Sequence, residues 1–587
     1  MEDQKRENLL NLALSASEEE RERSENLEVG YDREDKTWEL IVRHSGGLEE
    51  LAALGIMVRQ LLNGYAILRV PESLIDQVSA FNQIEYVEKP KRLFFAVNGG
   101  KAASCLLGLQ PRAGLGSTRE NGQSPAGLIT GLTSGLTGRG VLTAVVDSGI
   151  DYFHPDFRNE DGTTRILYLW DQNLGEVYSA RQINEALAAG SRSEGLKLVP
   201  SVDAGGHGTA VAGIAAGNGR AGGGVYRGVA YESKLLVVKL GNPLSDNFPR
   251  TTQLMEGLDF VVRRAQELRM PVAVNISFGN TYGSHDGTSL LETYMDDISN
   301  YGRSVLVAGT GNEGVGFGHT AGKLTMGENS LSELSVAPFE TGMGVQLWKS
   351  YADQFGVELM TPSGETLGPL DEQLGPETFQ YGQTRILVYY GKPSPYSPFQ
   401  EVYFDFIPVR DYLDSGIWTF RLIPRRLVTG QFDFWLPSRG ILNPATRFLL
   451  ADPATTLTIP STASKVISVG AYDDANRAYA DFSGRGFTRQ TNQVKPDLAA
   501  PGVGIVTAKS GGGYEAVTGT SFAAPFVTGS AALLMQWGII DGNDPFLYGE
   551  KVKAYFRRGA RPLPGFTEYP NPQVGYGALC VRDSLPV

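Results

Sequence analysis

The chain has 587 residues, of which 41% are hydrophobic and 20% are charged, a balance typical of a soluble globular protein. This length exceeds that of one ordinary domain, so we expect two to four folding units. The formal net charge of -13 argues against nucleic acid as the main partner, because that binding needs a basic surface to neutralise phosphates.

Cys105 and Cys580 are the 2 cysteines of the chain, too few for a disulfide framework or a cluster of thiolate metal ligands, and we expect two reduced thiols. Residues 1–25 mix charges throughout and lack the apolar core and cleavage site of a secretory signal. No uninterrupted apolar run reaches membrane-spanning length. The sequence therefore predicts a cytoplasmic or spore-associated protein with no membrane partner.

Residues 1 to 26 are dense in Glu, Lys and Arg, and only the LLNLAL stretch is apolar, which predicts an exposed helix or a flexible arm. From Trp38 the pattern becomes strand, short helix, two strands around a turn at Asn63–Gly64, a helix that begins at PESL, and a closing strand, IEYVEKP. We expect a compact strand-and-helix unit over residues 36–92.

Residues 94–137 have weak periodicity and many Gly, Ser and Thr, as in an exposed linker. Beyond it, short β-branched runs alternate with helical stretches. The expected strands are VLTAVVD, SKLLVVKLG, MPVAVNISFG and SVLVAGTGN, and the expected helices are TTQLMEGLDFVVRRAQEL and LLETYMDDISNYG. This alternation predicts a parallel sheet with crossover helices.

Between residues 328 and 450 the helical pattern gives way to short aromatic-rich strands separated by Pro and Gly turns. The strands are VQLWKSY, FGVELMTP, RILVYYG, VYFDFIP, IWTFRLIP and QFDFWLP. Trp418, Phe420 and Leu422 alternate with polar residues, which predicts a β-sandwich inserted into the α/β unit. After it, KVISVGAYD resumes the earlier strand style and TSFAAPFVTGSAALLMQWG is a long helix.

Three glycine-flanked polar residues stand at strand ends or helix starts: Asp147 in VVDSGID, His207 in GGHGTAVAGIAAG and Ser521 in GTSFAAP. These segments resemble the Asp, His and Ser signatures of the subtilisin-like serine proteases, in the same chain order. SFG at 277–279 and GTGNEG at 309–314 match as well. The resemblance implies an α/β fold, a subtilisin-like parallel sheet flanked by helices, and serine endopeptidase activity.

A serine hydroxyl is a weak nucleophile and needs a base, here His207, to accept its proton as it attacks a peptide carbonyl. Asp147 is placed to hold the resulting imidazolium in one tautomer. Ser521 lies near the amino end of the long helix, where backbone amides favour developing negative charge. The resemblance further implies that Asn312 stabilises the oxyanion. It also implies a substrate-binding edge formed by Ser277, Phe278 and Gly279. The first pocket is implied to be lined by Gly309, Thr310 and Gly311.

The unit at 36–92 resembles a subtilase prodomain, which acts as chaperone and inhibitor and is released by self-cleavage, here expected within Phe94 to Ser104. We therefore expect an N-terminal α+β prodomain over residues 1–97 and an inserted all-β jelly roll over residues 328–450. The catalytic domain is expected in two parts, residues 98–327 and 451–587. This arrangement is similar to the clostridial Csp germination proteases. It implies a protein or peptide substrate, with a spore cortex hydrolase zymogen as the candidate, and the cleaved prodomain as a partner.

Two other functions remain open. Some Csp members have lost catalytic residues and act as regulatory pseudoproteases, although all three triad positions and Asn312 are present here. The sandwich could instead bind glycans through Trp348, Trp418 and Trp435, which we expect to be core residues.

No cofactor and no metal are predicted. Calcium near Asp156 and Asp161 is an alternative, since subtilisins commonly bind it, but no regular spacing of oxygen ligands is present. We expect these carboxylates to be structural surface charge, and His154 to serve a turn.

Overall fold

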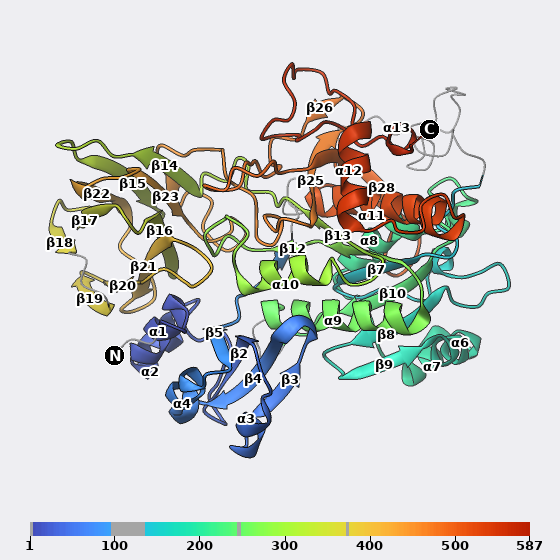
Figure 1. Ribbon diagram of the computed structural model, residues 1–587, viewed down its shortest axis with the longest axis horizontal. Coiled ribbons are helices and arrows are strands. Elements are labelled where there is room, and N and C mark those ends of the chain that lie inside the picture. Colours follow the sequence, from blue (N-terminus) through green and yellow to red (C-terminus); the bar gives the residue numbers. More distant parts are fainter. Residues whose placement is uncertain (1–3, 96–134, 243–247, 371–374, 587) are drawn as a thin grey trace. The chain divides into compact units, whose positions relative to one another are not determined.

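The computed structural model describes residues 4–95, 135–242, 248–370 and 375–586 (Figure 1). Its contacts divide the chain into two compact units. The sandwich unit comprises Met1–Arg92, Asn280–Tyr294 and Glu313–Ile459, and the central-sheet unit comprises Leu93–Gly279, Met295–Asn312 and Pro460–Val587.

The central-sheet unit is built on a 9-stranded sheet with the order β26-β25-β13-β11-β7-β10-β8-β9, and β27 pairs with β25. All pairs are parallel except those of β9 with β8 and β26 with β25. The strands are β7 (Leu142–Asp147), β8 (Ile166–Asp171), β9 (Glu176–Ser179), β10 (Lys234–Lys239), β11 (Val272–Ile276), β13 (Ser304–Gly309), β25 (Ile467–Asp473), β26 (Ala478–Tyr479) and β27 (Leu498–Pro501). Every residue of β7, β11 and β13 is buried, as expected for parallel strands covered on both faces.

Helices cover this sheet on both faces (Figure 1). The helices of the unit are α6 (Ala180–Ala188), α7 (Arg192–Leu198), α8 (His207–Ala216), α9 (Thr251–Leu268), α10 (Leu290–Ile298, which continues from the sandwich unit), α11 (Thr520–Met535), α12 (Gly549–Gly559) and α13 (Val581–Ser584). Short turns η3 (Pro155–Phe157), η4 (Arg220–Gly222) and η5 (Gln536–Ile540) and a hairpin of β28 (Ile505–Ala508) and β29 (Tyr514–Val517) complete it. The expected parallel sheet with crossover helices is confirmed.

The two faces are distinguished by neighbouring residues at the end of β7. A Cβ at Gly257 of α9 would lie 3.0 Å from Val146, and a Cβ at Gly208 of α8 would lie 3.2 Å from Cβ of Asp147. Because successive strand residues point to opposite faces, α9 packs on one face and α8 on the other.

Helix α11 is the buried core helix of this unit, with every residue buried and with contacts to α8, β11, β13 and β25. Within the described chain, Thr520–Ile540 is the one helical stretch long and apolar enough to cross a membrane, and 83% of its apolar window is buried inside the fold. Burial of this kind is typical of a globular core helix.

In the sandwich unit, residues 319–448 form two antiparallel sheets with the orders β14-β23-β16-β21-β20-β19 and β18-β17-β22-β15-β24 (Figure 1). The strands are β14 (His319–Lys323), β15 (Ser330–Val336), β16 (Met343–Ser350), β17 (Gln354–Met360), β18 (Thr366–Leu370), β19 (Gly375–Tyr381), β20 (Thr384–Tyr390), β21 (Phe399–Pro408), β22 (Gly416–Arg426), β23 (Gln431–Trp435) and β24 (Arg447–Phe448). Trp418, Phe420 and Leu422 are fully buried in the core that both sheets share, so the predicted β-sandwich is confirmed. Trp418 and Trp435 are buried, which leaves Trp348, partly buried, as the accessible member of the proposed glycan-binding set.

The N-terminal part of the sandwich unit is a five-stranded antiparallel sheet with the order β1-β2-β4-β3, and β5 pairs with β2. Its elements are α1 (Asn8–Ser15), α2 (Glu18–Arg23), β1 (Tyr31–Asp32), β2 (Thr37–His44), α3 (Glu49–Ala53), β3 (Met57–Gln60), η1 (Leu62–Gly64), β4 (Tyr65–Pro71), η2 (Glu72–Leu74), α4 (Ile75–Ala80) and β5 (Ile84–Glu88). The expected strand-and-helix unit is present.

The expectation of an exposed or flexible arm over residues 1 to 26 is wrong for α1. Leu9, Leu10 and Leu12 are buried, and they share one apolar core with Leu387 and Tyr389 of β20. Tyr403 and Ile407 of β21 belong to the same core. The apolar side chains of LLNLAL thus pack against residues that are about 380 positions later in the sequence. Burial of this kind stabilises the fold by about 25 cal/mol for each Å² of apolar surface removed from water.

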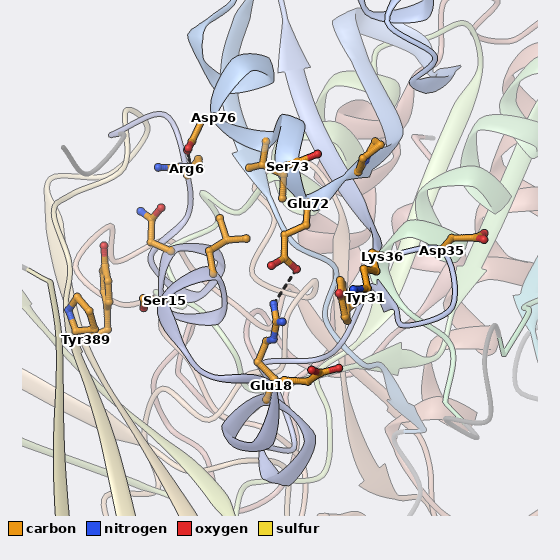
Figure 2. Close-up of a pocket in the computed structure, with 16 residues that line it drawn as sticks. Arg6, Ser15, Glu18, Tyr31, Asp35, Lys36, Glu72, Ser73, Asp76 and Tyr389 are labelled. Carbon is orange, nitrogen blue, oxygen red and sulfur yellow. Dashed lines mark hydrogen bonds and ion pairs between the residues drawn. The ribbon is translucent and has the colours of Figure 1, made fainter.

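A cavity of about 930 Å³ lies beside α1 and α2 (Figure 2). An ion pair of 2.8 Å joins Nη1 of Arg21 to Oε2 of Glu72 at its wall, and Tyr389 lines it from β20. None of its lining residues belongs to the predicted catalytic set.

Candidate active site

Asp147 and His207 meet at the carboxyl end of β7. Nδ1 of His207 lies 2.7 Å from Oδ1 of Asp147, which also accepts a hydrogen bond of 2.7 Å from the backbone N–H of Ser148. Asp147 is fully buried and His207 is 9% exposed. A carboxylate in this position orients the imidazole and stabilises its cationic form.

Glycines make this approach of helix to strand available. Gly206 precedes α8 with a φ of 74°, in the left-handed region that glycine adopts without a Cβ penalty. A Cβ at Gly208 would lie 2.2 Å from the carbonyl oxygen of Gly149. The first turn of α8 can therefore lie against the end of β7 only because position 208 has no side chain.

Ser521 lies in the first turn of α11 and is fully buried. Its hydroxyl donates to the backbone carbonyl of Ser277 over 3.2 Å. The His207 ring lies near the next residue, Phe522, with ring centroids 5.2 Å apart, and near Phe278 at 6.4 Å. Asp147 and Ser521 are 374 residues apart in the sequence. The fold thus brings the Asp, His and Ser motifs together at one end of the sheet.

Asn312 lies beside the same helix terminus. Its Oδ1 accepts hydrogen bonds from the backbone N–H and the hydroxyl of Thr520, over 3.1 and 3.2 Å. Its Nδ2 is buried and has no hydrogen-bond partner among the described residues. Gly311 donates its N–H to the same Thr520 hydroxyl over 3.1 Å, so the amide donor of Asn312 is held in place but uncommitted.

The residues predicted to line the first pocket, Gly309, Thr310 and Gly311, are buried. Thr310 is fully buried, and its N–H donates to the carbonyl of Val469 on β25 over 3.0 Å. A Cβ at Gly309 would lie 3.0 Å from the carbonyl oxygen of Thr520, so this glycine permits β13 to approach the start of α11 closely.

The predicted substrate-binding edge is occupied by the chain itself. Beyond Ser277, β12 (Phe278–Gly279) pairs antiparallel with β6 (Phe94–Phe95), with Phe278 opposite Phe95 and Gly279 opposite Phe94. The preceding Leu93 donates its N–H to the carbonyl of Pro249 over 2.8 Å. The edge therefore accepts an extended segment by strand addition. The rest of the predicted cleavage window, and Cys105, lie outside the described residues.

The remaining polar candidates have structural contacts. Nδ1 of His154 accepts the N–H of Asp156 over 3.2 Å at the start of η3, as expected for a turn residue. Asp161 is exposed, as predicted, but Asp156 is 1% exposed and accepts hydrogen bonds from the Ala221 N–H and the Tyr514 hydroxyl. The prediction of surface charge is therefore wrong for Asp156, whose carboxylate is stabilised by these donors. Within the described ranges, no group of three His, Cys, Asp or Glu side chains could hold a metal ion.

Sequence reasoning missed two buried polar residues behind the site, Asn275 on β11 and Thr528 on α11. The available signal was an asparagine inside the otherwise apolar run VAVNI, where a buried amide needs specific partners.

Comparisons with known proteins agree with this geometry. Residues 4–91 match the family model of the Csp protease B prodomain, and residues 138–381 and 451–577 match the subtilase family. The structure of the Clostridium perfringens CspB protease is 38% identical, with a TM-score of 0.72 over 76% of this chain and 93% of that one.

Two Bacillus subtilis (strain 168) proteases are also similar. The minor extracellular protease Vpr is 23% identical over 479 residues, 77% of this chain and 52% of Vpr. The serine protease AprX is 34% identical over 151 residues, 22% of this chain and 32% of AprX. The match thus spans about half of the length of Vpr and about a third of the length of AprX. The chain belongs to the subtilase family.

Proposed function

We propose that Asp147, His207 and Ser521 hydrolyse peptide bonds as a catalytic triad. The observation that carries the proposal is the 2.7 Å contact of His207 Nδ1 with the buried Asp147, beside the helix terminus that bears Ser521. His207 Nε2 takes the Ser521 proton as Oγ attacks the carbonyl carbon, and then returns it to the leaving amine. Asp147 stabilises the transient imidazolium.

The negative charge that develops on the carbonyl oxygen is stabilised by Nδ2 of Asn312. This buried donor has no other partner in the described chain, so it costs no reorganisation when the oxyanion forms. A donor of this kind contributes about 10²- to 10³-fold to turnover, a magnitude measured in subtilisin itself.

The first substrate of the site is the chain's own linker. Phe94 and Phe95 pair with the edge that follows Ser277, and the carbonyl of Ser277 contacts Ser521 Oγ. The pairing runs from Phe94 opposite Gly279 to Phe95 opposite Phe278, the residue next to Ser277. Cleavage within Phe94 to Ser104 separates an N-terminal prodomain, residues 1–97 in outline, from the mature protease.

Self-cleavage is tested by mass spectrometry of the purified chain. The wild type is expected as two fragments with a new N-terminus within the window, and Ser521→Ala as one full-length chain. If both proteins remain intact or both are cut identically, the triad assignment is wrong.

The substrate in trans is a protein, and we assign a spore cortex hydrolase zymogen to this role, consistent with the similarity to the CspB protease. Incubation of the processed protease with such a purified zymogen should yield a shortened, active hydrolase, and Ser521→Ala should not. An unchanged zymogen would remove this substrate and leave the peptidase assignment standing.

A regulatory pseudoprotease is the competing function. It is disfavoured by the intact Asp147–His207 contact, which a signalling role does not require. A fluorophosphonate probe distinguishes the two, because only a nucleophilic Ser521 is labelled; lack of labelling after prodomain removal would favour the pseudoprotease.

A further inference from the structure

The carbonyl group of Ser521 lacks its usual helical partner. In an α-helix this carbonyl accepts the N–H four residues later, and that residue is Pro525, which has no N–H. The hydroxyl of Ser277 donates to the Ser521 carbonyl instead, over 3.0 Å. A side chain from the substrate-binding segment therefore replaces a backbone hydrogen bond at the nucleophile.

The Ser277 hydroxyl is itself held by two buried residues. Nδ2 of Asn275 donates to Oγ of Ser277 over 2.8 Å. The Thr528 hydroxyl donates to Oδ1 of Asn275 over 3.1 Å and shares its proton with the Ala524 carbonyl at 3.2 Å. Asn275, Ser277 and Thr528 are each no more than 1% exposed. Three hydrogen bonds thus run in one direction, from α11 through β11 and back to α11 at Ser521.

The direction of these bonds determines the amide orientation. With Oδ1 toward Thr528 and Nδ2 toward Ser277, the Ser277 proton is directed to the Ser521 carbonyl. The opposite orientation would make Asn275 an acceptor from Ser277 and leave that carbonyl without this donor. Bonds aligned head to tail also polarise one another in a low-dielectric core.

We propose that Asn275 and Thr528 are positioning residues that act through Ser277 to fix the place of Ser521 relative to the substrate edge. Ser277 contacts Ser521 twice, because its Oγ donates to the Ser521 carbonyl and its own carbonyl accepts from Ser521 Oγ. Locking the Ser277 side chain therefore locks the distance between the nucleophile and the segment that binds the peptide. This inference rests on the proposed triad.

The test uses the rate of self-cleavage in the full-length chain, an intramolecular step that needs no external substrate and has no KM. Thr528→Val keeps the shape of the side chain and removes the hydroxyl, whereas Thr528→Ser keeps the hydroxyl. We expect Thr528→Val and Asn275→Leu to slow self-cleavage about 10-fold or more, and Thr528→Ser to cleave at the wild-type rate. Melting temperatures measured in the Ser521→Ala background identify any variant that fails to fold.

Pro525→Ala provides a second test that does not depend on those variants, because it restores the N–H that Ser521 lacks. Ser277→Ala should slow self-cleavage about 10-fold in the natural sequence, but less than about 3-fold when Pro525→Ala is also present. Equal slowing in both backgrounds would overturn the inference. So would wild-type rates in folded Thr528→Val, or equal losses in Thr528→Val and Thr528→Ser. A wild type that does not cleave would contradict the proposed function instead.

Discussion

Asn312 presents chemically different atoms to two neighbours. Its Oδ1 accepts from the N–H and hydroxyl of Thr520, which holds the side chain at the start of α11, and its Nδ2 stays uncommitted. An amide carries its acceptor and its donor on separate atoms, so one atom can anchor the side chain while the other remains available.

Asn312→Asp is therefore a sharper substitution than Asn312→Ala. It retains the oxygen that Thr520 contacts but replaces the N–H donor with a second acceptor. We expect peptide turnover to fall about 10²- to 10³-fold or further. The melting temperature should fall as well, because the new carboxylate oxygen is buried without a donor. Turnover against a peptide substrate checks this, and Asn312→Asp that retains wild-type turnover would refute the oxyanion role.

The sequence predicted those site residues that stand in glycine-flanked motifs, because the glycines report close approach of helix to strand, as at Gly208. It did not predict Asn275 or Thr528. Each looks like an ordinary member of a buried strand or helix. Their importance depends on hydrogen bonds between the segment of Asn275 and Ser277 and the helix α11, which meet only in the folded chain.

At the scale of elements, the contact between the segment after α2 and β21 contains buried carboxyl groups. Burial raises the pKa of Asp405 to about 7. The hydrogen bond from the Ser24 hydroxyl and the charge of Lys89 act in the opposite direction and lower this pKa. Burial likewise raises the pKa of Glu25 to about 7, opposed by Arg92 and assisted by Asp405 and Glu340. Both groups therefore hold a proton to higher pH in the folded chain than ordinary Asp and Glu side chains do.

A third carboxyl group, that of Glu401 at the other end of β21, behaves similarly. Burial, together with the charges of Glu7 and Glu88, raises its pKa to about 8, while Lys91 and a hydrogen bond from Asn8 lower it. The contact of the N-terminal segment with β21 thus contains three carboxyl groups whose pKa is raised by burial.

Stability of this contact is predicted to fall as pH rises. A carboxyl group with a raised pKa in the folded state stabilises the fold fully below its unfolded pKa of about 4. This stabilisation decreases as pH rises and is lost once pH passes the folded pKa of about 7 to 8. The free energy of unfolding falls by up to about 1.4 kcal/mol per group for each pH unit. The melting temperature of Ser521→Ala should decrease between pH 5 and 9, and less steeply when Asp405→Asn and Glu401→Gln are added. Parallel curves would contradict the assignment.

Element prediction succeeded where the chain alone determines the pattern. The six aromatic-rich strands of the sandwich were identifiable, but β15 reads SLSELSV and places serine as well as leucine on its buried side, and β18 contains Gly-Pro. The burial of α1 was not identifiable for a different reason. Its partners on β20 and β21 are distant in sequence, and a short amphipathic helix does not specify what will cover it.

For the whole molecule, the shared core of the sandwich unit predicts that the prodomain is retained after cleavage. Leu10 is fully buried in that core, with Tyr389 and Tyr403 of the sandwich, and these contacts do not pass through the cut linker. The two fragments should elute together in size-exclusion chromatography without denaturant and separate in it.

Leu10→Ala should weaken this retention, since it removes about 2–5 kcal/mol from a fully buried site. It should lower the denaturant concentration at which the fragments separate. An exposed substitution on the same part of the chain, Glu34→Ala, serves as the matched control and should leave separation unchanged. Fragments that separate without denaturant in the wild type would contradict retention.

The pairing of β6 with β12 then has a consequence for competition. A ladder of two residues binds weakly as a free peptide, but Phe94 and Phe95 remain covalently attached to a retained prodomain. Their local concentration at the edge is then set by the tether, on the order of millimolar for a short connection, and is independent of how dilute the protease is. A substrate in trans must therefore be present above that concentration, or must pair with the edge over a longer segment. Competition with the tethered residues thus favours substrates that pair over more than two residues.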